Sequence, residues 1–362
     1  GVQTCALPIW NHTMKFGASA QRFQWNTDNP AFWQGQFSFP DLATMLRLGN
    51  SSATYRLPIS STNRGLRTWL MAFYGQTDYR MTPNLTLNMG FRWEYTTGVS
   101  EVNNNISYLA RGPIVSTPAD LTKGKLWDNH IKNFQPRIGF NWAVGGSQFT
   151  SLSGGFGVYH NQILHNSFVS FRDQLPFNFR ATATNVPFAA FPNIEQVVLQ
   201  AGQNFNASRH FDYDNFKTPT YYRYNLTIQR QLPGEMVAKI GYVGSVARHL
   251  ARRQLLNVFP EPVVRADGSL FFGCGSLQAV QVPTATCPNP VYQAINRNFG
   301  RIEWMSSDVN SAYNSLVASI SKRFSKGVTF AANYTWSKSI DDYSQSRSEE
   351  HTSELQSRFG IS

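Results

Sequence analysis

Charged residues are scarce in this chain of 362 residues, because Asp, Glu, Lys and Arg together make up 15% of it. A soluble protein has about 25%. Scarce charge combined with 14% aromatic residues excludes an intrinsically disordered chain, which has many charges and few aromatic rings. No apolar run approaches the roughly 20 residues with which a helix spans a bilayer, so a helical membrane protein is excluded as well. A β-rich chain remains, either soluble or embedded in a membrane.

Cysteine is rare too, with three residues in the whole chain. Cys5 belongs to a terminal segment that is treated separately below. The other two, Cys274 and Cys287, are separated by 12 residues. An isolated pair at short spacing favours one local disulfide in an oxidising compartment. Two free thiols are the alternative.

Both ends of the chain match translated sequencing-adapter DNA rather than protein. Residues 1–9 read GVQTCALPI and residues 347–357 read RSEEHTSELQS, which correspond to opposite strands of one common adapter. We therefore expect residues 1–9 and 347–362 to be adapter-derived and unpacked. Residues 10–346 are then the natural segment, a partial barrel domain from a longer protein.

The natural segment is basic but shows no nucleic-acid signature. Without the two Arg and three Glu of the tail it has 30 basic and 18 acidic residues, a net charge of +12. These basic residues are scattered along the chain without a basic run, so no nucleic-acid partner is predicted.

Apolar and polar residues alternate with period two in nine segments, and Leu85 to Tyr95 is the clearest of them. The segments lie near 12–26, 66–81, 85–99, 131–144, 149–163, 219–232, 236–249, 311–324 and 328–340. Short turns such as Thr82-Pro83-Asn84 alternate with long connections near 27–65, 100–130, 164–218 and 250–310. Alternating short turns and long loops are typical of outer-membrane barrels, whose tilted strands need about 9–11 residues to cross the membrane.

The sequence therefore predicts an all-β fold, an antiparallel transmembrane β-barrel fragment. We expect about nine strands in an open curved sheet, with short periplasmic turns and long extracellular loops. Two unpaired edges should leave residues 10–346 unable to close a barrel or to transport by themselves. A soluble β-sandwich or a secreted carbohydrate-binding β-protein is the alternative.

Four phrases resemble the barrel domain of TonB-dependent outer-membrane receptors, particularly the Oar-like group. They are YGQTDYRMTPNLTLNMGFRWEY at 74–95, FQPRIGFNWAVGG at 134–146, YNLTIQRQLPGEMVAKIGYVGS at 224–245 and YNSLVASISKRFSKGVTFAANYTWSKSIDD at 313–342. The resemblance implies the outer membrane of a Gram-negative bacterium and energised uptake of a bulky nutrient, such as a siderophore, oligosaccharide or peptide. It implies TonB, a plug domain and outer-membrane lipid as partners. A structural or adhesive outer-membrane barrel without a transport role is the alternative.

The alternation also assigns seven polar side chains to the lumen: Lys15, Arg92, Glu94, Arg137, Arg223, Asn225 and Lys239. They form either a path that favours acidic solutes or a solvated and ion-paired wall. In the long aromatic loop at 164–218, the candidates for sugar or peptide contact are Phe177, Phe179, Phe191 and Tyr213; the alternative is that the loops fold on one another. No catalytic motif stands in a supporting context, so no enzyme activity, cofactor or metal site is predicted.

Overall fold

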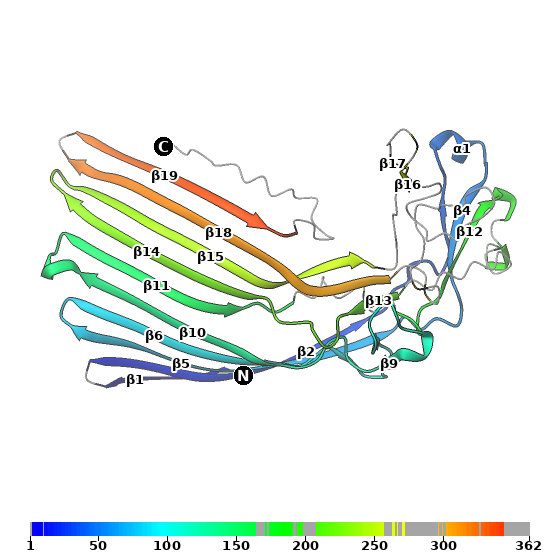
Figure 1. The fold of residues 1–362 in the computed structure, drawn as a ribbon, viewed down its shortest axis with the longest axis horizontal. Helices are drawn as coiled ribbons and strands as arrows, with labels where there is room; N and C mark the ends of the chain where they lie inside the picture. Colours follow the sequence, from blue (N-terminus) through cyan, green and yellow to red (C-terminus); the bar gives the residue numbers. More distant parts are fainter. Residues whose placement is uncertain are drawn as a thin grey trace.

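An open, twelve-stranded sheet dominates the computed structural model of the protein (Figure 1). The structure describes residues 2–9, 11–163, 171, 174–190, 193, 195–197, 208–256, 263–264, 266, 270–271, 296, 299, 302–325 and 327–343. The long strands, each antiparallel to the next, are β2 (His12–Thr27), β5 (Arg64–Thr82), β6 (Leu85–Thr96), β10 (His130–Ala143), β11 (Thr150–His160), β14 (Thr220–Leu232), β15 (Met236–Leu255), β18 (Ile302–Ser325) and β19 (Val328–Asp341). They pair in chain order, and they are the nine strands that the alternation predicts.

The connections differ sharply between the two ends of the sheet. At one end, tight turns join β5 to β6, β10 to β11, β14 to β15 and β18 to β19 (Figure 1). Gly234, with a φ of 80°, is a residue that the β14–β15 turn requires, because an L side chain rarely adopts that backbone conformation. At the other end, the described parts of the long connections gather beyond the strands (Figure 1).

The register of the strands gives the sheet one polar and one apolar face, because residues directly opposite each other in an antiparallel pair share a face. One cross-strand row of the apolar face consists of Leu85, Trp142, Leu152, Ile228, Ile240, Ala318 and Tyr334. Large side chains on this face are exposed, among them Phe73 (58%) and Ile138 (55%). In water such a surface is unfavourable, so its exposure indicates an apolar environment around the sheet.

Three of the long connections fold on one another into a second region, which we call the loop module: the described residues of 28–63, 97–129 and 161–219. Its regular elements are β3 (Gln36–Ser38), α1 (Leu42–Leu46), β4 (Ser51–Arg56), β7 (Ser100–Glu101), β8 (Ser107–Leu109), the 3-10 turn Pro118–Asp120, β9 (Leu121–Lys123), β12 (Arg180–Val186), the 3-10 turn Phe188–Ala190 and β13 (Ser208–Phe211). Strand β4 pairs with β12, so the first connection is joined to the third. The fourth connection contains a short pair, β16 (Val263–Val264) with β17 (Leu270–Phe271).

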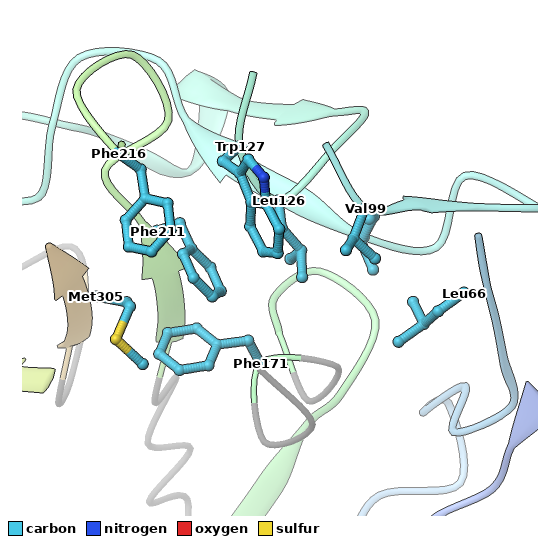
Figure 2. Close-up of a cluster of buried hydrophobic side chains, with 9 residues drawn as sticks. Leu66, Val99, Leu126, Trp127, Phe171, Phe211, Phe216 and Met305 are labelled. Carbon is cyan, nitrogen blue, oxygen red and sulfur yellow. The ribbon is translucent and has the colours of Figure 1, made fainter. Parts of the chain in front are cut away.

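The loop module has a hydrophobic core of its own (Figure 2). The cluster consists of nine buried side chains: Leu66, Val99, Ile106, Leu126, Trp127, Phe171, Phe211, Phe216 and Met305. Two of them, Leu66 and Met305, belong to the strands β5 and β18. The core therefore attaches the module to the loop end of the sheet.

The N-terminal segment departs from expectation. Residues 2–9 form strand β1 (Val2–Ile9), which pairs antiparallel with β2 along its whole length, so the prediction that this end is unpacked was wrong. The edge of β2 presents unpaired N–H and C=O groups, and an adjacent extended segment satisfies them. The tail 347–362 lies outside the described residues. Among the described residues, no helix has the length and apolar character needed to cross a bilayer.

Candidate functional site

All seven polar residues assigned to the lumen lie on the polar face of the sheet. Lys15, Gln76, Gly90, Arg137, Gly157 and Arg223 form one cross-strand row. Arg92 and Glu94 follow Gly90 on the same face of β6, Asn225 follows Arg223 on β14, and Lys239 lies on the same face of β15. The row places Arg137 and Arg223 two strands apart with only Gly157 between them.

Arg92 and Glu94 form an ion pair within this face. The Arg92 Nε donates to Glu94 Oε1 at 2.7 Å, and the Glu94 side chain is 10% exposed. This pair is the kind of contact expected for an ion-paired wall, which is one of the two alternatives that the sequence allows for the polar face. Its charges compensate each other, so it offers little attraction to a solute.

The centre of the polar face is hollowed into a cavity of about 880 Å³. Its charged lining consists of Arg137, Arg223, Lys239 and Asp78, a net positive set. The Asp78 carboxylate accepts a hydrogen bond from Asn88 Nδ2 at 2.7 Å. Glycines at several wall positions leave the space that the cavity occupies.

Two arginines of this cavity share one aromatic ring. The guanidinium carbon of Arg137 lies 4.4 Å from the ring centroid of Tyr159, and that of Arg223 lies 5.4 Å from it. Both distances fall within the range of cation–π attraction. Arg137 also donates from Nη2 to Gln135 Oε1 at 3.2 Å, and the Gln135 side chain is buried. The ring and the amide thus orient guanidinium groups that remain accessible.

Tyr159 and Gly157 are functional candidates that the sequence analysis did not single out. Tyr159 belongs to the predicted strand 149–163 and alternates with Gly155 and Gly157 on the polar face. Those glycines present no side chain, so the polar character of this face of β11 was hidden in the sequence. Tyr159 lies two residues after Gly157 in the predicted strand 149–163, and this spacing is the signal that could have assigned it to the polar face.

The aromatic loop candidates are engaged within the loop module. Phe177 is buried, with Arg64 and Lys123 each 5.5 Å from its ring centroid. The Phe179 backbone exchanges hydrogen bonds with Ser60 Oγ, its N–H donating at 2.9 Å and its carbonyl accepting at 3.0 Å. The Tyr213 ring stacks on Tyr108 with centroids 3.9 Å apart. Their contacts correspond to loops that fold on one another.

Other expectations fall on residues that the structure leaves undescribed. Phe191, Cys274 and Cys287 lie outside the described residues, so the loop contact and the disulfide stay predictions. Within the ranges that are described, no group of three or more His, Cys, Asp or Glu side chains is arranged to hold a metal ion.

His210 of β13 is the most strongly perturbed titratable group of the loop module. It is fully buried beside Ser208, and its Nδ1 lies 3.3 Å from the Ser107 carbonyl oxygen. Burial penalises the charged imidazolium and lowers the pKa of His210 to about 4, although the Ser107 carbonyl acts in the opposite direction. His210 is therefore neutral at physiological pH and belongs to the packing of the module.

Comparison with known proteins identifies the class to which this two-faced sheet belongs. The sequence matches the outer membrane beta barrel domain over residues 7–360. The chain therefore belongs to this family of outer-membrane proteins of Gram-negative bacteria, as its alternation and loop lengths predicted. The short turns are then periplasmic, and the loop module lies outside the cell.

Solved structures with a similar arrangement come from larger proteins. They include the outer membrane transporter YddB from Escherichia coli, which is 13% identical, with 92% of this chain and 32% of that chain covered and a TM-score of 0.48. A mutant of the ferric enterobactin receptor PfeA from Pseudomonas aeruginosa is 11% identical, with 93% and 34% covered and a TM-score of 0.47. The siderophore receptor PirA from Acinetobacter baumannii is 8% identical, with 93% and 35% covered and a TM-score of 0.46. The chain thus spans about a third of the length of these structures. No curated protein sequence matched this chain.

Proposed function

We propose that this chain forms part of the barrel wall of a TonB-dependent, Oar-like receptor that takes up a bulky nutrient across the outer membrane. The observation that carries the proposal is the pairing of an exposed apolar face with a polar face that bears a cationic cavity. An apolar face suits contact with lipid, and a polar face suits a water-filled or plugged lumen. The four receptor-like phrases of the sequence support the same assignment.

In this proposal the two regions have different tasks. The loop module, at the extracellular end, contacts the nutrient first, since rigid scaffolds usually carry recognition on their loops. The polar face then lines the route of the nutrient through the lumen of the barrel, and no step of the process is catalytic. Siderophore, oligosaccharide and peptide are the cargo classes, and TonB with a plug domain are the partners.

Uptake by the complete receptor tests this function. Cells that express the complete receptor should accumulate one member of a labelled panel of siderophores, oligosaccharides and peptides. Accumulation should cease when TonB is deleted or when a protonophore collapses the proton gradient. If TonB-proficient and TonB-deficient cells behave identically while receptor-bearing cells gain surface adhesion, the chain belongs to a structural or adhesive barrel instead.

We also propose that residues 1–9 and 347–362 derive from adapter DNA and that residues 10–346 are the natural barrel segment. The supporting observation is the adapter match at both ends. Reading the genomic locus tests the proposal, since the natural gene should diverge from this sequence at about residues 10 and 346. A locus that encodes both segments in frame would refute it.

A further inference from the structure

We propose that Arg137, Tyr159 and Arg223 form a binding site for a carboxylate group on the polar face of the sheet. This inference deepens the proposed function by naming the ligand chemistry of that face, and it rests on the proposal that the face lines the lumen. The ligand carboxylate belongs either to a dissolved organic acid or to an acidic side chain of polypeptide inside the barrel.

The first argument is the charge of the site. Two guanidinium groups lie against the ring of Tyr159, and Lys239 adds a third positive charge to the cavity. Arg92 on the same face has a carboxylate at 2.7 Å. Neither Arg137 nor Arg223 forms an ion pair with any carboxylate in the part of the chain that the structure describes. Asp78 offsets one of the three positive charges of the cavity lining, and the remaining net positive charge favours an anionic ligand.

The second argument is a buried amide that holds Arg137 in place. Gln135, on the same face of β10 two residues from Arg137, is 3% exposed. Its Oε1 accepts from Arg137, whereas its Nε2 has no hydrogen-bond partner among the described groups. Gln135 lies outside the cavity lining, and its amide oxygen holds the guanidinium of Arg137, which lines the cavity.

The third argument is geometric. Guanidinium groups present planar pairs of N–H donors that match the two oxygens of a carboxylate, which makes arginine the preferred partner of such groups. Stacking on Tyr159 limits the freedom of both side chains before a ligand arrives. The cavity of about 880 Å³ has room for a small organic acid or an acidic side chain.

Gly157 makes this arrangement possible. It lies between Arg137 and Arg223 in the cross-strand row. The Tyr159 ring covers Gly157 so closely that a Cβ there would be 2.8 Å from Tyr159 Cε2. A side chain at position 157 would therefore displace the ring from its place between the two guanidinium groups. Gly157 is a positioning residue for the site.

Citrate is the probe for the dissolved form of the ligand. The purified complete receptor in detergent should bind citrate saturably in equilibrium dialysis. The variant Arg137→Gln/Arg223→Gln should weaken binding about tenfold to hundredfold, since it removes hydrogen bonds between charged groups. Lys15→Gln is the matched control, because it removes a positive charge from the same row outside the cavity. It should change the affinity less than about twofold.

Three further variants separate a built site from diffuse charge. Tyr159→Phe keeps the ring and should keep citrate affinity, whereas Tyr159→Leu and Gly157→Ala should weaken it although neither changes the charge. Heat-modifiable electrophoretic mobility confirms that each variant is folded. Binding that depends on total charge alone, and is insensitive to Tyr159→Leu and Gly157→Ala, would overturn the proposal.

The receptor's own polypeptide can supply the carboxylate instead, and then wild-type receptor binds no citrate. In that case the variant Arg137→Lys, treated with a carbodiimide, should form an amide with the neighbouring Asp or Glu, which peptide mass spectrometry locates. Citrate binding unchanged by the double glutamine variant, or absent citrate binding together with absent cross-linking, contradicts the proposal. The assays require neither TonB nor uptake. A receptor that binds citrate at this site but does not transport would therefore support the carboxylate site and contradict the proposed transport function.

Discussion

The sheet and the loop module obey opposite rules of burial. In the sheet, large apolar side chains such as Phe73 and Ile138 remain more than half exposed. In the loop module, Phe211 and Trp127 are almost fully buried and their ring centroids lie 4.8 Å apart. The module has the interior of a water-soluble domain, whereas the sheet relies on backbone pairing and on the solvent around it. One chain therefore folds against two different solvents, lipid and water.

This comparison predicts the largest effect in the core of the loop module. Phe211 packs against Trp127, Phe171 and Phe216, with centroid distances of 4.8, 4.6 and 4.9 Å. Phe211→Ala should cost about 3–5 kcal/mol of module stability, because the cavity it leaves is enclosed. Hydrogen exchange of the module in the complete receptor measures this cost. Phe73→Ala, on the exposed face of the sheet, is the matched control and should leave module exchange unchanged.

Charge placed on the two faces of β6 should have unequal consequences. Met89→Arg puts a charge on the apolar face and should cost about 2–4 kcal/mol if that residue lies near the bilayer midplane. Asn88→Arg puts the same charge on the polar face, where Asp78 can accept its hydrogen bond in place of the Asn88 amide. Urea titration of the complete receptor in lipid vesicles measures both. Equal losses would show that the faces are misassigned.

Acidification should destabilise the loop module. His210 has a pKa of about 4 in the folded module and about 6.5 when unfolded. The unfolded state binds the proton more tightly than the folded module does. The contribution of neutral His210 to the free energy of unfolding is therefore fully present above pH 6.5 and is lost as pH falls towards 4. The module should lose about 2 kcal/mol between pH 7.5 and pH 5. Protease susceptibility of the loops against pH measures it, and a His210→Gln variant should show a smaller dependence in this window; an unchanged profile would contradict the assignment.

The same contrast decides what the sequence could predict. The alternation of apolar and polar residues within each strand shows which side chains lie on which face of the sheet. Leu85–Thr96 was therefore recognisable as a strand without knowledge of its neighbours. The loop module depends on partners far apart in the chain, such as Ala53 opposite Ala183 across β4 and β12. No local periodicity of the sequence predicts such contacts. At the candidate site, the period-two alternation predicted that Arg137 and Arg223 face the lumen. It did not single out Tyr159, whose ring contacts both, because the neighbours of Tyr159 on the same face of β11 are glycines.

The smallest predicted effect concerns a polar group on the apolar face of the sheet. Asn314 of β18 lies opposite Gly244, next to Tyr224 of β14 in the same cross-strand row. Its Oδ1 accepts from the Tyr224 hydroxyl at 2.9 Å and from the Tyr242 hydroxyl at 2.8 Å. The two tyrosines thus satisfy an amide oxygen on a surface that otherwise suits lipid.

Either tyrosine alone is sufficient to satisfy the Asn314 oxygen, so Tyr224→Phe or Tyr242→Phe should each cost only about 0.5 kcal/mol. The double variant leaves the oxygen without a donor in an apolar environment, and it should cost about 1 kcal/mol more than the two single effects together. A double-mutant cycle by urea titration in lipid vesicles measures that coupling. Strict additivity would mean that water reaches Asn314, and the boundary between lipid and water on β18 would then lie on the periplasmic side of this residue.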